Sequence, residues 1–126
     1  MKKITIILLV IITAFMHSCI KAESDKVIET VSVEAFEKLI NEKTGVLVDV
    51  RTEEEFQEGH IDGALLMDVE GDNFKLQIKA LDKKVPVLVY CRSGRRSLVA
   101  AEILKTEGFV KIYNLDGGFN DWVDKH

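Results

Sequence analysis

Residues 86–97 read PVLVYCRSGRRS, a continuous apolar run that is followed at once by a polar loop containing one glycine. The run 86–90 lacks the alternation of a half-exposed strand, and this is typical of a strand buried on both faces of a parallel sheet. Residues 95–107 repeat apolar side chains at helical spacing and stop before Gly108, which predicts a helix. Cys91 therefore comes directly after a buried strand, at the edge of the sheet where open α/β folds bind ligands.

The rest of the chain alternates between the same two patterns. We expect further strands over residues 27–31, 46–50, 61–67 (which opens on a turn) and 110–115, and further helices over residues 32–43, 52–59, 73–81 and 119–123. Thr52 and Glu55 have the spacing of a capping box, in which the first side chain binds a backbone N–H at the start of a helix. Strands that alternate with helices predict an α/β fold built on a mainly parallel sheet.

The N-terminus has the pattern of an export signal. Two lysines precede an apolar stretch, residues 4–16, which is shorter than the roughly 20 residues of a membrane span and matches the apolar region of a secretory signal. Cys19 follows, and its position resembles the processing site of bacterial lipoproteins, where the cysteine becomes the lipidated first residue. We therefore expect a signal peptide (1–18), a tether (19–26) and one folded domain (27–126), exported to the bacterial cell envelope or periplasm and lipid-anchored at Cys19. An uncleaved anchor, or cleavage a few residues further on, is the alternative.

Composition and charge narrow the function classes. The chain has 126 residues, 47% of them hydrophobic and 30% charged, which is the composition of one globular domain. Its formal net charge of −4 argues against a broad nucleic-acid surface, because such surfaces are basic. Of the two cysteines only Cys91 lies in the expected domain, so no internal disulfide is expected there. No residues have metal-ligand spacing, so we expect neither a metal nor another cofactor, and membrane contact only through the anchor.

The loop after Cys91 combines several features that stabilise an anion. Consecutive backbone N–H groups in a short turn between a strand and a helix can converge on one point, and the helix adds its positive N-terminal end. Arg92, Arg95 and Arg96 place three cations next to the cysteine. These groups favour the thiolate, so we expect the pKa of Cys91 to lie below the value of about 8.5 for free cysteine. A buried, inert thiol is the competing interpretation of a cysteine at a strand end.

Three motifs, in this order along the chain, resemble those of the rhodanese-like sulfurtransferases. The N-terminal signature of that family is similar to VDVR (48–51) with EF (55–56) and GHIDGA (59–64), and its active-site loop is similar to CRSGRRS (91–97). Its C-terminal signature is similar to LDGGF (115–119), which Trp122 follows. The resemblance spans nearly the whole domain and implies a central five-stranded, mainly parallel sheet flanked by helices.

The same resemblance implies a covalent reaction cycle. The Cys91 thiolate would attack the outer sulfur of a small anionic donor such as thiosulfate and become a persulfide, from which cyanide, a small thiol or a protein thiol would remove the sulfur. The substrate pocket is expected to be lined by the rest of the loop, namely Arg92, Ser93, Gly94, Arg95, Arg96 and Ser97. Arg92 and Arg95 are the candidates for binding the donor, whereas the resemblance implies that Arg96 braces the loop. Asp49, at a neighbouring strand end, is expected to accept a hydrogen bond from such an arginine and not to act as a base.

Two other function classes fit parts of the pattern. Cysteine-based phosphatases and arsenate reductases use a similar loop, but they generally carry an arginine six positions after the cysteine, where this chain has Ser97. A rhodanese-like module that binds a partner or carries sulfur without general turnover is the second alternative, although the loop around Cys91 is intact. His60 is a poor candidate for a general base, because a thiolate of low pKa needs none and its surrounding motif is typical of a packed turn.

Overall fold

The computed structural model describes residues 26–126 of the chain. The expected signal peptide and the expected lipidation residue Cys19 lie outside these residues. Along the described part, helices and strands follow one another in the order β1 Ile28–Val31, α2 Val33–Asn41, β2 Val46–Asp49, α3 Glu53–Glu58, β3 Leu65–Leu66, α4 Phe74–Ile78, β4 Val87–Tyr90, α5 Arg95–Thr106, β5 Ile112–Leu115 and α6 Gly118–Lys125. Within this part, no helix combines the length and the apolar character that crossing a bilayer requires.

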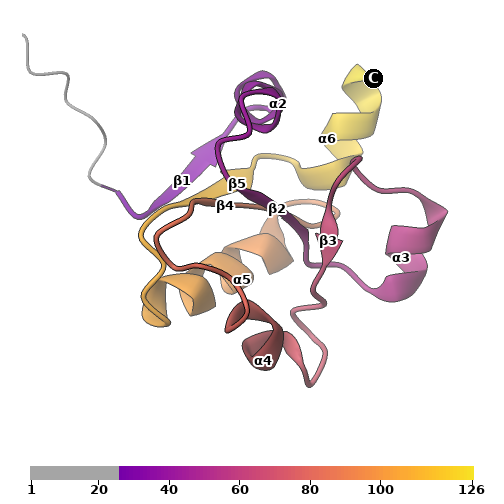
Figure 1. Cartoon of the computed structure of the whole chain (residues 1–126). Coiled ribbons are helices and arrows are strands. Elements are labelled where there is room, and N and C mark those ends of the chain that lie inside the picture. The colour runs from indigo at the N-terminus through magenta and orange to yellow at the C-terminus, as the bar shows by residue number, and fades with distance from the viewer. Residues whose placement is uncertain (1–25) are drawn as a thin grey trace, which may run out of the picture.

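The five strands form one parallel sheet in the order β1-β5-β4-β2-β3 (Figure 1). This arrangement confirms the predicted α/β fold with a five-stranded sheet. β4 lies in the middle, between β5 and β2, so both of its edges are paired. The carboxyl ends of β2 and β4 meet at one edge of the sheet, where Asp49 is in register with Tyr90, the residue before Cys91.

Helices cover both faces of the sheet and bury β4 completely. α4 and α5 lie on one face, and α2 and α6 lie on the other (Figure 1). Val87 and Val89 pack into the cluster on the α5 side, whereas Leu88 and Tyr90 pack into the cluster on the α2 side. Each fully buried aliphatic side chain contributes about 1.5–3 kcal/mol relative to its exposed state. The uninterrupted apolar run in this strand therefore follows from burial on both faces.

Some predicted elements are shorter in the structure. The strand predicted over 110–115 does not include Val110, because the backbone N–H of Val110 donates to the carbonyl of Lys83 in a loop and not to a neighbouring strand. The strand predicted over 61–67 is reduced to the two residues of β3, since only these pair with β2. These differences lie away from the end of β4, so the position of the cysteine loop is the one predicted.

Candidate functional site

Cys91 lies directly beyond β4, and its sulfur is enclosed by the loop that leads into α5. The residue is buried, with 1% of its surface exposed. The backbone N–H of Gly94 donates to Sγ at 3.0 Å, and Oγ of Ser97 lies 3.4 Å from the same sulfur. Gly94 has a φ of +103°, a conformation that favours glycine and that turns the loop back toward the cysteine.

The pKa of Cys91 is lowered in the folded protein, as the sequence predicted. Burial by itself raises this pKa, because a low-dielectric environment disfavours the charged form. Hydrogen bonds outweigh burial, and they come from the hydroxyl and the backbone N–H of Ser97 and from the backbone N–H groups of Gly94 and Ser93. The thiolate is thus stabilised chiefly by loop amides and one hydroxyl, and the neighbouring arginines are not among the largest contributions.

The hydroxyl of Ser97 contacts both the sulfur of Cys91 and the backbone carbonyl of Gly94. Its hydroxyl donates to the carbonyl oxygen of Gly94 at 3.1 Å while Oγ lies within reach of Sγ. A hydroxyl has only one proton to donate. When Cys91 is a thiol, the sulfur can donate to Oγ; when it is a thiolate, the hydroxyl proton can turn to the sulfur.

We expect Ser97→Ala to raise the pKa of Cys91, because the sulfur loses the side-chain hydrogen bond that stabilises its negative charge. Rates of alkylation by iodoacetamide, measured against pH, should show a higher midpoint than in the unmodified protein. Ser93→Ala is the matched control, since it removes a loop hydroxyl but keeps the backbone N–H that contributes to the site. An unchanged midpoint in Ser97→Ala would contradict this assignment.

Two loop arginines are held by Glu55, a residue of α3 whose spacing from Thr52 indicates helix capping and not this contact. Nη1 and Nη2 of Arg96 donate to the two carboxylate oxygens at 2.8 and 2.9 Å, and Nε of Arg92 donates to one of them at 3.2 Å. The bidentate pair agrees with the bracing role expected of Arg96. Arg95 is exposed and takes no part in this cluster. The two arginines expected to bind the donor therefore lie in different environments.

The ion pairs lower the pKa of Glu55 from 4.5 to about 2, and the hydrogen bond from Arg96 is the largest cause. A carboxylate with a lowered pKa stabilises the folded state above its unfolded pKa, and this contribution is lost as the pH falls through its folded pKa. We expect Glu55→Gln to lower the free energy of unfolding by about 1–2 kcal/mol near pH 7, and the difference to shrink between about pH 5 and pH 2.

Urea unfolding near pH 7 and near pH 3 measures this effect. Glu54→Gln, on an exposed position of the same helix, is the control and should change the free energy of unfolding little at either pH. A Glu55→Gln effect of equal size at both pH values would show that the ion pairs are not its source.

Asp49 binds a different arginine from the one expected. Its carboxylate accepts hydrogen bonds from Nε and Nη2 of Arg51, at 3.0 and 2.7 Å, and from the backbone N–H of the same residue at 3.0 Å. The side chains of Asp49 and Arg51 are both buried. Arg51 also donates to the carbonyl of Gly59 at 2.7 Å, and this hydrogen bond holds the C-terminal end of α3 next to the end of β2. The prediction that Asp49 accepts from a loop arginine is therefore wrong, because Glu55 receives those arginines.

His60 is exposed and lies in the turn that follows α3. His60 stacks on Phe56 with ring centroids 3.7 Å apart, and its Nδ1 lies 2.9 Å from the carbonyl oxygen of the same residue. The phenol of Tyr90 accepts the backbone N–H of Ile61 at 3.0 Å, and burial raises the pKa of this phenol. Among residues 26–126, no group of three or more His, Cys, Asp or Glu side chains could hold a metal ion.

The start of α6 supports the loop through two backbone hydrogen bonds. The backbone N–H of Phe119 donates to the carbonyl of Cys91 at 2.8 Å, and that of Asn120 donates to the carbonyl of Arg92 at 3.0 Å. Gly118 allows this close approach, since a Cβ at this position would lie 2.6 Å from both carbonyl oxygens. The LDGGF motif indicates packing at this glycine but does not indicate that the loop is what it packs against.

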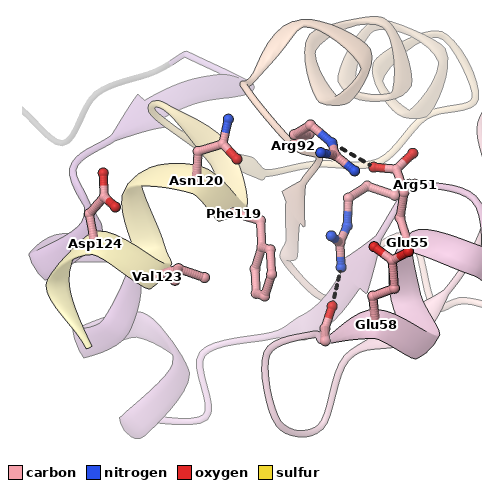
Figure 2. Close-up of a pocket in the computed structure, with 9 residues that line it drawn as sticks. Arg51, Glu55, Glu58, Arg92, Phe119, Asn120, Val123 and Asp124 are labelled. Atoms are coloured by element: carbon pink, nitrogen blue, oxygen red, sulfur yellow. Dashed lines mark hydrogen bonds and ion pairs between the residues drawn. The ribbon is translucent and has the colours of Figure 1, made fainter.

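A cavity of about 470 Å³ lies beside the loop, between α3 and α6 (Figure 2). It is lined by Arg51, Glu55, Glu58, Gly59, Arg92, Phe119, Asn120, Val123 and Asp124. Of the residues predicted for the site, only Arg92 lines it. Figure 2 shows side chains of α6 on one side and those of Arg51 and α3 on the other, with the ring of Phe119 in between. No local pattern predicts this cavity, because its walls come from segments that are distant in the sequence.

Comparison with known proteins finds relatives over most of the chain. A family model described as a rhodanese-like domain matches residues 32–125. The thiosulfate sulfurtransferase GlpE of Pseudomonas fluorescens is 40% identical over 83 residues, which are 66% of this chain and 74% of that protein. The protein of the same name in Coxiella burnetii is 38% identical over 96 residues, 75% of this chain and 85% of that one. Among solved structures, the human single-domain sulfurtransferase TSTD1 has a TM-score of 0.66 at 26% identity and covers 77% of this chain and 96% of its own.

Proposed function

Because the chain belongs to the rhodanese-like family, we propose that it is a sulfurtransferase that carries sulfur as a persulfide on Cys91. The donor is a small anion such as thiosulfate, and the acceptor is cyanide or a thiol. The hydrogen bonding of Cys91 carries this proposal: a sulfur just beyond a buried strand accepts the N–H of Gly94 and lies beside the hydroxyl of Ser97. Groups that stabilise a thiolate in this position also stabilise the charge of a persulfide.

In the first half-reaction the Cys91 thiolate attacks the outer sulfur of thiosulfate. The sulfur–sulfur bond of the donor breaks, sulfite leaves with the bonding electron pair, and the persulfide anion forms on Cys91. Arg92 can bind the sulfonate oxygens, because its side chain is 55% exposed and only its Nε is used by Glu55. Arg95, which is exposed at the start of α5, is the second candidate for attracting the anion.

In the second half-reaction the acceptor attacks the outer sulfur of the persulfide. The bond between this sulfur and Sγ breaks, the acceptor keeps the transferred sulfur, and Cys91 leaves as a thiolate. The lowered pKa of Cys91 makes it a good leaving group, so the same amides and hydroxyl assist both half-reactions.

A matrix of donors and acceptors tests this function with the purified protein. Thiosulfate alone should release one equivalent of sulfite per protein, and steady-state rates with thiosulfate and cyanide should follow ping-pong kinetics. Release of sulfite only when the acceptor is also present would contradict a covalent intermediate.

Hydrolysis of a phosphate ester is the rival reaction for a cysteine in such a loop. Ser97 stands where phosphatases generally carry an arginine, and both terminal nitrogens of Arg96 are bound to Glu55. The loop therefore presents few guanidinium groups to the oxygens of a phosphate. We expect p-nitrophenyl phosphate to remain intact under conditions in which thiosulfate is turned over.

A carrier of sulfur for one protein partner is the second alternative. Such a module would load sulfur from thiosulfate, but none of the small acceptors in the matrix would unload it. If thiosulfate loads sulfur onto the protein and cyanide or a small thiol then removes it over many cycles, the result would favour a general sulfurtransferase over a carrier.

We further propose that the chain is exported and anchored through a lipid on Cys19. The support is the sequence pattern alone, in which a basic start and an apolar stretch precede this cysteine. Cys19→Ser should move the protein from the membrane fraction to the soluble fraction and abolish incorporation of labelled palmitate, whereas Cys91→Ser should leave both unchanged. Equal membrane association of the Cys19→Ser variant and the unmodified protein would contradict the anchor.

A further inference from the structure

The carboxylate of Glu55 uses both of its oxygens to bind cations of the reactive loop. Oε1 accepts from Nη1 of Arg96, and Oε2 accepts from Nη2 of Arg96 and from Nε of Arg92. Figure 2 shows the contact between Glu55 and Arg92 beside the cavity. The two guanidinium groups and the carboxylate together carry one positive charge, whereas the arginines alone would carry two.

Arg96 lies close to the reactive sulfur, but its terminal nitrogens are directed to Glu55. The pKa of Arg96 is raised chiefly by the hydrogen bond to Glu55, and the charge of Cys91 adds to this effect. The side chain of Arg96 is 23% exposed, so a small anion can reach it. A planar guanidinium beside a reactive centre binds two oxygens of such an anion well. Glu55 therefore occupies the cation that is best placed to hold an oxyanion near Cys91.

The affinity of the loop for oxyanions acts on the donor and on the product alike. Thiosulfate and sulfite both carry three oxygens on one sulfur, so groups that bind these oxygens in the donor also bind them in the product. Binding that is equal before and after the reaction does not accelerate the chemical step, and it slows the departure of the product. A carboxylate that occupies the arginines weakens the binding of both anions.

We propose that Glu55 is a positioning residue that sets the oxyanion affinity of the reactive loop. By occupying Arg96 and one N–H of Arg92, it keeps this affinity low enough for sulfite to leave once the persulfide has formed on Cys91. This inference rests on the proposed sulfurtransferase function. The role differs in sign from a purely structural one, because loss of a structural brace weakens the binding of an anion, whereas loss of this carboxylate strengthens it.

Sulfate tests this affinity, because it has the shape and charge of thiosulfate but no sulfur to transfer. Its binding is measured as protection of Cys91 from iodoacetamide, at an ionic strength held constant with chloride. In Glu55→Gln we expect the half-protecting concentration of sulfate to fall about 3- to 10-fold. The concentration of thiosulfate that gives half of the maximal loading rate should fall by a similar factor. Values that are unchanged or higher in Glu55→Gln would overturn the proposal.

Glu58→Gln is the matched control, since it removes the same charge from the same helix and the same cavity. Within residues 26–126, Glu58 forms no ion pair with either loop arginine. It should change the half-protecting concentration of sulfate by less than about 2-fold. Glu55→Asp keeps the negative charge beside the arginines and should bring the value back toward that of the unmodified protein. Equal falls in Glu58→Gln and Glu55→Gln, or no recovery in Glu55→Asp, would also overturn the proposal.

The protection assay separates this failure from a failure of the proposed function, because it requires no turnover. The expected loss of about 1–2 kcal/mol in Glu55→Gln leaves the protein folded, since small domains are stable by about 5–15 kcal/mol, and circular dichroism checks this. If the protein loads sulfur but sulfate binds Glu55→Gln no more tightly, only the role of Glu55 is wrong. If no sulfur is loaded from any donor, the sulfurtransferase function itself is wrong.

Discussion

Cys91→Ser is expected to abolish sulfur transfer, with a loss of roughly 10⁴- to 10⁶-fold in kcat, the range found when a covalent nucleophile is removed from an enzyme. A serine hydroxyl at this position can accept the same hydrogen bonds but cannot form a persulfide. Intact-mass measurement after treatment with thiosulfate should show a gain of one sulfur in the unmodified protein and no gain in the variant.

The fold should survive this replacement, because serine is close to cysteine in size and the loop offers it the N–H of Gly94. Circular dichroism and urea unfolding therefore serve as the controls. Sulfur gain in Cys91→Ser would place the reactive group elsewhere in the chain and would overturn the assignment of the site.

Gly118→Ala is expected to damage both stability and activity, because a methyl group there would lie 2.6 Å from the carbonyl oxygens of Cys91 and Arg92. The residue also has a φ of +62°, which costs a non-glycine residue about 1–2 kcal/mol. Relief of the overlap requires the loop or α6 to move, which adds about 1–3 kcal/mol to the loss of stability. A shift of about 1 Å in the reactive sulfur can reduce the rate about 10²-fold.

Gly63→Ala provides the matched control for this prediction. Gly63 has a φ of +84°, but a Cβ there meets no atom within 4 Å. It should therefore lose only the roughly 1–2 kcal/mol of backbone strain and keep its activity. Urea unfolding and the thiosulfate–cyanide assay measure the two effects, and equal losses in both variants would show that contact with the loop is unimportant.

The fold and the position of Cys91 could be predicted from local patterns. The run 86–90 is apolar because both faces of β4 are covered, and a glycine three residues after the cysteine marks the turn into α5. Both signals lie within a few neighbouring residues. Patterns of this kind predict elements and their ends, and in an α/β fold the ends of strands indicate the site.

The partners of the loop could not be predicted in the same way. Glu55 has the spacing of a helix-capping residue, and Thr52 does cap α3 by accepting the backbone N–H of Glu55 at 3.3 Å. The carboxylate of Glu55 nevertheless binds Arg92 and Arg96, which are 37 and 41 positions away in the sequence. Ion pairs over such separations depend on how α3 packs beside the loop, and no local pattern records this packing.

Asp49 and Arg51 show an intermediate case. They are two residues apart, so their pairing was within reach of a local interpretation. The three arginines near Cys91 nevertheless make a loop arginine the more obvious partner for Asp49 in the sequence. Asp49 ends β2 and Arg51 follows two residues later, and both side chains are buried there. The carboxylate therefore binds the guanidinium that is buried beside it.

The strand order also bears on how the chain acquires its structure. β5, the last strand to be synthesised, lies inside the sheet between β1, the first, and β4. Until it is inserted, β1 has no hydrogen-bonded neighbour and the helix that supports the reactive loop is not yet in place. Support of the reactive loop therefore arrives late in folding, and an emerging polypeptide that still lacks β5 and α6 would hold its cysteine in an unsupported loop.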